Sequence, residues 1–389
     1  MDRALSGDHA VAWAVRLARA EVIPVFPITP QTLIMEQLAD FIADGEMNAD
    51  LVPAESEHSV MSVAIGASAG GVRTFTATSS QGLALMHEML YAVPQNRLPI
   101  VMVNVNRSLG AASGIWLEHN DSMAARDSGW IQVYVETAQE ALDMVLQAYR
   151  LAEDERVLLP VMVCLDGFVL SHTVEKVNLP SQEEVDDFLV DFWPRNMLDP
   201  QSPSLLNPIV PPDYAMEMRR QLDDAMERSL YVAEEVDLIF REQFDRSYGG
   251  GIEEYRMEGA EYAILCLGTA AGTAKEAVDR LREQGEKAGL LRLRFMRPFP
   301  HGQLAKACAH LKALGIFERS ISFDGRGPLY AQVASSLYGS RLPLTEHIGG
   351  LGGRDVTVKD LLEVYALVRR QGTGEKVRLT TWHGLRGTP

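Results

Sequence analysis

A carboxylate, Glu57, opens a helix that consists almost entirely of small and apolar residues. It follows a short apolar strand at 50–54, and residues 60–71 read Val-Met-Ser-Val-Ala-Ile-Gly-Ala-Ser-Ala-Gly-Gly. Because Gly, Ala and Ser add little bulk, another backbone or a flat ligand can approach such a helix closely. A carboxylate in these surroundings is either paired with a donor or functional.

A second candidate is Thr29, which lies between Pro27 and Pro30 in the loop Phe-Pro-Ile-Thr-Pro-Gln-Thr at 26–32. The loop follows an apolar strand and precedes a helix, so we expect it at the carboxyl end of a sheet, where open α/β folds bind ligands. A hydroxyl fixed there could face a substrate carboxylate. Alternatively, Thr29 or Thr32 only caps the helix.

Two further loops are expected at the same edge. Residues 77–82, Ala-Thr-Ser-Ser-Gln-Gly, offer hydroxyls, an amide and a flexible glycine, or else form the N-cap of the next helix. Arg107 follows the apolar strand at 100–105 and could bind a small carboxylate through two hydrogen bonds. It could instead pair with Glu118 or Asp121.

The elements that must position these residues alternate between strands and helices. In 1–175, helices separate apolar strands near 22–26, 51–53, 73–78, 100–105, 131–134 and 159–165. This alternation predicts the α/β class, with a doubly wound, mainly parallel sheet covered by helices on both faces.

The rest of the chain divides into a connector and a second α/β unit. Residues 176–255 contain a cluster of prolines and then a long charged helix at 213–244. This composition indicates a connector rather than a core. Residues 256–389 return to alternating strands and helices, with a helix expected at 302–314 and a strand at 316–323.

Composition excludes several classes of protein. The formal net charge of -17 argues against nucleic acid or anionic lipid as a partner. With no apolar run of 18 residues and no signal-peptide pattern, we expect a cytoplasmic protein without a membrane span. The three cysteines, Cys164, Cys266 and Cys308, are too few for an iron-sulfur cluster within the chain and do not suggest a disulfide framework.

Taken in order, these segments resemble the alpha subunit of the pyruvate:ferredoxin oxidoreductase family, the 2-oxoacid:ferredoxin oxidoreductases of the pyruvate synthase type. The resemblance covers nearly the whole chain and rests on 26–32, 55–71, 74–90, 98–109, 154–168, 293–300 and 327–330. It implies a pyrimidine-binding domain of the thiamine diphosphate fold in 1–175 and a transketolase C-terminal-like domain in 256–389.

The resemblance also implies roles for single residues. Glu57 would hydrogen-bond N1' of the cofactor's aminopyrimidine ring and so promote the imino tautomer that removes the proton from the thiazolium C2. Thr29 and Arg107 would bind the carboxylate and keto group of the substrate. Other residues that it places at the cofactor are Pro27, Ile28, Ser80 and Gln81.

Further parts of the enzyme are expected on other chains. The sequence lacks the Gly-Asp-Gly and Asn pattern that holds magnesium and diphosphate in this cofactor class. The resemblance therefore implies a beta subunit that binds Mg²⁺ and the diphosphate, ferredoxin-like and gamma subunits with [4Fe-4S] clusters on the partner chains, ferredoxin as electron carrier, and coenzyme A as cosubstrate.

The substrate is expected to be a monocarboxylic 2-oxo acid, above all pyruvate, because an oxalate enzyme of this family would carry a basic residue in place of Thr29. The segment 116–121 differs from the commonest form in pyruvate enzymes, which leaves 2-oxoisovalerate, 2-oxoglutarate and phenylglyoxylate open. A scaffold subunit that has lost catalysis is a further alternative.

Overall fold

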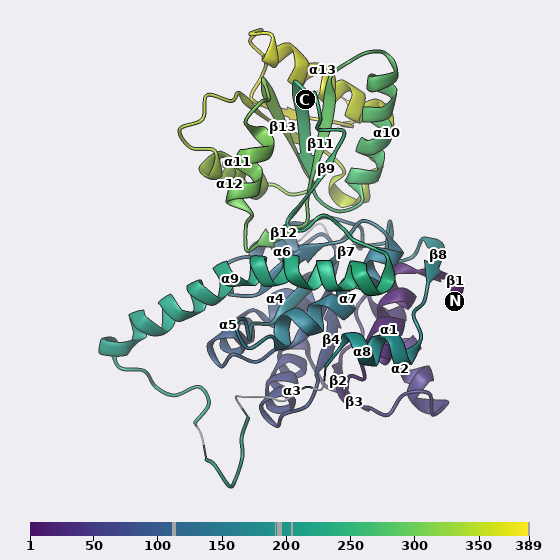
Figure 1. Cartoon of the computed structure of the whole chain (residues 1–389), viewed down its shortest axis with the longest axis vertical. Helices are drawn as coiled ribbons and strands as arrows, with labels where there is room; N and C mark the ends of the chain where they lie inside the picture. Colours follow the sequence, from purple (N-terminus) through teal and green to yellow (C-terminus); the bar gives the residue numbers. More distant parts are fainter. Residues whose placement is uncertain (111–113, 191, 193–196, 204, 388–389) are drawn as a thin grey trace.

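A computed structural model describes residues 1–389 except 111–113, 191, 193–196, 204 and 388–389 (Figure 1). It contains two α/β units, and Figure 1 shows the second above the first. Among the described residues no helix is both long and apolar enough to cross a membrane.

The first unit is built around a five-stranded sheet in the order β12-β6-β7-β5-β4. Its strands are β1 (Asp2–Ser6), β2 (Val22–Val25), β3 (Asp50–Pro53), β4 (Phe75–Thr78), β5 (Val101–Asn106), β6 (Ile131–Tyr134), β7 (Val161–Asp166), β8 (Val174–Asn178) and β12 (Phe295–Arg297). Its helices are α1 (Gly7–Leu17), α2 (Thr32–Ala43), α3 (Glu57–Ala69), α4 (Ser80–Leu85), α5 (His87–Gln95), α6 (Asn120–Ala124), α7 (Ala138–Glu153), α8 (Gln182–Phe188) and α9 (Pro212–Phe244).

The second unit is built around a six-stranded sheet in the order β15-β14-β13-β10-β11-β9. Its elements are β9 (Ile252–Tyr255), β10 (Tyr262–Cys266), α10 (Ala270–Glu283), β11 (Ala288–Leu293), α11 (His301–Cys308), β13 (Ala313–Glu318), α12 (Pro328–Ser336), β14 (Leu344–Ile348), a 3-10 turn (Leu351–Gly353), α13 (Val358–Gly372) and β15 (Thr380–Trp382). Most strand pairs in both sheets are parallel, which confirms the predicted fold class.

A proline explains why β2 and β3 are only loosely joined to the first sheet. The two strands pair with each other in parallel, and a single bridge from Val22 to Thr74 connects β2 to the β4 side. Pro24 has no N–H to continue the ladder, and its carbonyl instead accepts a bond from the Thr76 hydroxyl at 2.9 Å. The carboxyl ends of β2 and β3 therefore lie beside those of β4 and β5.

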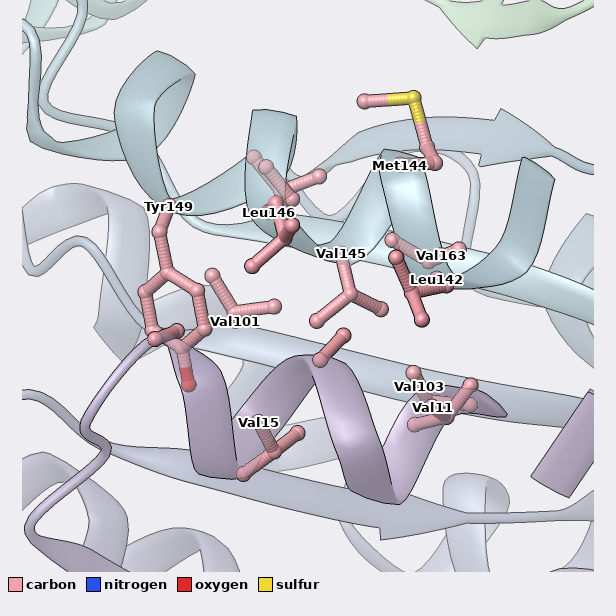
Figure 2. Packing of buried hydrophobic residues seen from close by; sticks show 14 of the residues in the cluster. Val11, Val15, Val101, Val103, Leu142, Met144, Val145, Leu146, Tyr149 and Val163 are labelled. Atoms are coloured by element: carbon pink, nitrogen blue, oxygen red, sulfur yellow. The ribbon is translucent and has the colours of Figure 1, made fainter. Parts of the chain in front are cut away.

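Two helices cover one face of the first sheet. Figure 2 shows valines of α1 close to the apolar side chains of α7 and β5. In α7 the buried residues Leu142, Val145, Leu146 and Tyr149 recur at spacings of three and four, the stripe that a helix presents to a core. This packing fixes the strand β5, whose end carries Arg107.

The segment 176–255 is more closely packed than a connector. The long helix expected at 213–244 is present as α9, but its second half buries Val232, Val236 and Phe240 in the first core. Phe240 lies 5.2 Å from Phe188 of α8 between ring centroids. The expectation of a segment outside any core was wrong here, because charges on the exposed face of α9 mask its apolar stripe.

Buried charges and a shared strand join the two units. Strand β12 follows the second sheet's β11 in the chain but pairs antiparallel with β6 of the first sheet. Glu140 of α7 accepts bonds from Arg292 at 2.6 Å and from Arg294 at 2.8 Å, and all three are almost fully buried. Burial alone would raise the pKa of Glu140, but the two guanidiniums lower the pKa to about 2.

We expect Glu140→Gln to lower the free energy of unfolding by about 3–5 kcal/mol, because two buried guanidiniums would lose their anion. Folding lowers the pKa of Glu140 from 4.5 to about 2. Its contribution to the free energy of unfolding is therefore complete above pH 4.5 and is lost as the pH falls toward 2. The difference from the wild type should therefore shrink across that window in denaturant titrations at several pH values.

The control is Glu276→Gln, which removes the carboxylate of an exposed pair with Arg280. It should change the free energy of unfolding by less than about 1 kcal/mol. Equal effects of the two variants would show that the buried junction does not hold the units together.

Candidate active site

Loops from four neighbouring strands form one edge of the first sheet. Because β2, β3, β4 and β5 run in the same direction, their carboxyl ends meet there. The structure thus brings together the loops that carry Thr29, Glu57, Ser80 and Arg107, as expected for loops that follow parallel strands. The edge is the position where open α/β sheets bind ligands.

Glu57 is the first residue of α3. Ser56 precedes it as the N-cap, and the Ser56 hydroxyl accepts a bond from the Ser59 amide at 3.3 Å. The Glu57 side chain is only 6% exposed, and within the described residues its carboxylate has no hydrogen-bond or ion-pair partner. A carboxylate that is withdrawn from water in this way can accept a bond from a ligand.

Gly82 of α4 lies directly against Glu57. A Cβ atom at Gly82 would be 2.6 Å from Glu57 Oε1 and 2.5 Å from Thr78 Oγ1. The hydroxyls of Thr78 and Ser79 are buried and have no partner in the part of the chain that the structure describes. The Glu57 carboxylate and the Thr78 hydroxyl therefore both lie against Gly82, and the hydroxyls of Thr78 and Ser79 have unused hydrogen-bonding capacity.

Ser80 is buried and hydrogen-bonded, whereas Gln81 faces solvent. The Ser80 hydroxyl donates to the Ser108 carbonyl at 2.6 Å, and Ser80 has a φ of 48°, in the left-handed region. Gln81 is exposed. Ser79 is the N-cap of α4, yet its hydroxyl makes no capping bond, so the alternative of a hydroxyl-capped helix is not seen. Ser80 therefore fixes the loop through its side chain.

Arg107 and Thr29 are in direct contact. The Arg107 guanidinium donates to the Thr29 carbonyl at 3.0 Å and to the Gly114 carbonyl at 3.1 Å. Its alternative role as an ion-pair partner is not seen, since Asp121 contacts only the Arg107 amide and no pair with Glu118 is present among the described residues. A guanidinium bound to carbonyls keeps its charge available for an anionic substrate.

The Thr29 loop is held by a hydrogen bond from Gln31. The Thr29–Pro30 peptide is cis, and Gln31 Nε2 donates to the Phe26 carbonyl at 2.9 Å. Gln31 is the N-cap of α2 and no side chain caps that helix, which argues against a capping role for Thr29. Thr29 and Pro27 are exposed, whereas Ile28 is half-buried.

Asp166, at the end of β7, connects the second unit to this edge. It accepts bonds from His119 at 2.8 Å, Arg319 at 2.7 Å and the Thr269 amide at 2.9 Å. Burial alone would raise the pKa of Asp166, but His119 and Arg319 lower it well below its usual range. Sequence reasoning missed Asp166, although an acid at the end of an apolar strand was a usable signal.

The chain offers no evident metal centre in its described part. No group of three or more His, Cys, Asp or Glu residues there could hold a metal ion. Cys164, Cys266 and Cys308 are all buried and form no disulfide, and burial raises the pKa of each thiol, to about 12 for Cys266 and Cys308.

Comparison with family models decides the family. Residues 13–237 match the model described as pyruvate flavodoxin/ferredoxin oxidoreductase, thiamine diphosphate-binding, and 260–361 match pyruvate:ferredoxin oxidoreductase core domain II. The chain belongs to the pyruvate flavodoxin/ferredoxin oxidoreductase family. Its first unit is therefore a thiamine diphosphate-binding domain of this family, as the resemblance implied.

Individual relatives agree over almost the full length. The pyruvate synthase subunit PorA of Methanothermobacter thermautotrophicus is 49% identical, with 99% of this chain and 98% of the relative covered. PorA of Thermotoga maritima is 45% identical over 93% of each chain. The ketoisovalerate oxidoreductase subunit VorA of Pyrococcus horikoshii is 43% identical, over 92% of this chain and 91% of the relative.

Solved structures share the fold. A 2-oxoglutarate:ferredoxin oxidoreductase from Magnetococcus marinus, determined with 2-oxoglutarate, coenzyme A and succinyl-CoA bound, superposes with a TM-score of 0.73 at 22% identity. The match covers 94% of this chain and 65% of that longer chain. A split-gene transketolase, an inactive beta4 tetramer, gives a TM-score of 0.56 at 15% identity, covering 96% of this chain and all of the other.

These findings confirm the predicted class, an alpha-type subunit of a 2-oxoacid:ferredoxin oxidoreductase. The geometry also fits thiamine diphosphate: Glu57 is buried without a hydrogen-bond partner among the described residues, the hydroxyls of Thr78 and Ser79 are unpaired there, and Gly82 leaves room for Glu57 and Thr78 to approach it closely. The roles of single residues stay predictions.

We expect Gly82→Ala to weaken the affinity for thiamine diphosphate about tenfold or more, because the added methyl group would overlap Glu57 and Thr78. Quenching of intrinsic fluorescence during cofactor titration of the assembled enzyme measures this. Gly66→Ala, in α3, is the control because its Cβ would meet nothing within 4 Å. Unchanged affinity in folded Gly82→Ala enzyme would show that no ligand approaches here.

Proposed function

We propose that this chain is the alpha subunit of a pyruvate synthase, which oxidatively decarboxylates pyruvate to acetyl-CoA and CO2 and passes the electrons to ferredoxin, or runs the reverse reaction. The observation that carries the proposal is the set of relatives called pyruvate synthase subunit PorA, 44–49% identical over 98–99% of this chain. We place the reaction in the cytoplasm.

Glu57 is the residue that we assign to cofactor activation. Its carboxylate would hold the proton at N1' of the aminopyrimidine ring, and the unpaired hydroxyl of Thr78, which lies against the same glycine, would offer that ring a further polar contact. Thiamine diphosphate supplies, when bound, the carbon centre that makes decarboxylation of a 2-oxo acid feasible. The site's low exposure strengthens a hydrogen bond to Glu57, since little water competes there.

Arg107 and Thr29 are assigned to the substrate. The guanidinium would bind the substrate carboxylate, and its bonds to the Thr29 and Gly114 carbonyls orient it without neutralising its charge. The Thr29 hydroxyl is held between two prolines and would orient the keto group. Pro27, Ile28 and the exposed Gln81 would border the cofactor.

Partner chains complete the proposed enzyme. In this assignment a beta subunit binds Mg²⁺ and the diphosphate of the cofactor, and ferredoxin-like and gamma subunits carry the [4Fe-4S] clusters. Ferredoxin accepts the electrons and coenzyme A accepts the acyl group. The resemblance in the active-site loops supports this division, and the chains that copurify with this one would test it.

A branched 2-oxo acid is the second candidate substrate, because the VorA relative is 43% identical. Initial rates of the purified complex with pyruvate, 2-oxoisovalerate, 2-oxoglutarate and phenylglyoxylate separate the candidates. A kcat/KM that is higher for any other acid than for pyruvate would replace pyruvate in the proposal.

Glu57→Gln should lower kcat of the assembled complex by about 10²–10⁴-fold, because an amide cannot hold the proton at the pyrimidine ring. The complex should stay intact in size-exclusion chromatography. Glu55→Gln is a matched control, since the exposed Glu55 carries the same change two residues earlier and bonds only locally with Ser59. Equal rates of Glu57→Gln and the wild type would favour the scaffold alternative.

Arg107→Ala should raise KM for the 2-oxo acid by about 10–100-fold, the equivalent of a lost charge-assisted contact. Arg107→Lys should recover part of the loss, because it retains the charge but not the planar fork. Arg126→Ala, which removes a cation on the surface of the same unit, should leave KM unchanged. An unchanged KM in Arg107→Ala would assign that residue to loop structure alone.

A further inference from the structure

Asp121 of α6 is a fully buried carboxylate on which five donors converge. Its Oδ1 accepts from the Asn106 side chain at 2.8 Å and from the Ser122 amide at 2.8 Å, and its Oδ2 accepts from the Asn104 side chain and the amides of Ser80 and Arg107, all at 3.1 Å. The donors come from three separate segments of the chain. Such an arrangement fixes the distances between those segments.

One oxygen of Asp121 connects the cofactor-facing and substrate-facing parts of the site. Through Ser80 it holds the start of α4, two residues before Gly82, which lies against Glu57. Through the Arg107 amide it holds the end of β5, from which the guanidinium reaches the Thr29 carbonyl. The Ser80 hydroxyl adds a second link between the same segments, through the Ser108 carbonyl at 2.6 Å.

The backbone of Ser80 is left-handed, and the hydrogen bond from the Ser80 amide to Asp121 helps to hold it in that conformation. A non-glycine residue with a φ of 48° is held in an uncommon conformation and persists only where its surroundings impose it. The bond from the Ser80 amide to Asp121 and the bond from its hydroxyl to Ser108 impose that conformation. The path of α4 against Glu57 therefore depends on a residue 41 positions away in the sequence.

We propose that Asp121 is the positioning residue that sets the separation between the cofactor-binding acid Glu57 and the substrate-binding cation Arg107. This inference rests on the proposed function of the site. A carboxylate suits the role because it only accepts hydrogen bonds, and every group around it donates. An amide in its place would point two N–H donors at other donors.

The test is Asp121→Asn in the assembled complex. Asp121 holds both the cofactor-facing and the substrate-facing parts of the site. KM for the 2-oxo acid and the dissociation constant for thiamine diphosphate should therefore each rise about tenfold. Cofactor binding is measured by fluorescence quenching, which does not depend on turnover. KM and cofactor affinity both equal to those of the wild type would overturn the proposal.

The matched control is Asp143→Asn, which makes the same change at another fully buried carboxylate of the first unit. Asp143 accepts two bonds from Arg246, at 2.6 and 2.9 Å, and one from Tyr248, and it lies in α7 away from the site loops. This variant should lower the melting temperature while KM and cofactor affinity stay unchanged. If it changes both constants as much as Asp121→Asn does, Asp121 has no special role.

A second variant keeps the proposal testable if Asp121→Asn does not fold. Asn104→Ala removes one donor to the Oδ2 atom that holds Ser80 and Arg107 but leaves the carboxylate in place. It should raise both constants by a smaller amount, about threefold. If KM and the dissociation constant for thiamine diphosphate in this folded variant equal those of the wild type, the positioning role of Asp121 is contradicted.

The outcomes also separate this inference from the proposed function. If the wild-type complex oxidises no 2-oxo acid, the proposed function fails, whatever Asp121→Asn does. If the wild type is active and Arg107→Ala raises KM, but Asp121→Asn changes neither constant, only the positioning role fails.

Discussion

Buried carboxylates between the two units are the constraint on which the active-site edge depends. Glu140 binds two arginines of the second unit, and Asp166 binds Arg319 and Thr269 from that unit and His119 from the first. Buried ion pairs contribute little net stability, because desolvation of the charges offsets their attraction. They are costly to separate, however, so they determine where the second unit must lie relative to the first sheet.

The order of strands and helices could be predicted from the sequence because it follows from local apolar patterns. The helix expected at 213–244 has nearly those bounds as α9, Pro212–Phe244. The helix expected at 302–314 ends earlier, at Cys308, and the strand expected at 316–323 begins at Ala313. Residues 313–315 belong to a short apolar run, and such a run fits a helix or a strand equally well. Their burial in the second sheet makes them part of β13.

The candidate site was only partly predictable. Thr29, Glu57 and Arg107 stood out because each follows an apolar strand, and the parallel sheet brings such positions to one edge. The contacts that organise them join residues far apart in sequence, as when Asp121 binds Ser80. Local patterns carry no information on such contacts, so Asp121 entered the sequence reasoning only as an alternative partner of Arg107.

The contrast among the buried acids supports a functional role for Glu57. Asp166 and Glu140 are surrounded by charged donors that lower the pKa of each carboxyl, and the donors around Asp121 offset part of the burial that raises its pKa. Asp8 has no hydrogen-bond partner among the described residues either, but burial raises its pKa well above the usual range, which favours the neutral acid. Glu57 lies at the ligand-binding edge close to the unpaired Thr78 hydroxyl and has no hydrogen-bond partner among the described residues. In the proposed function, a bound pyrimidine ring would supply that partner.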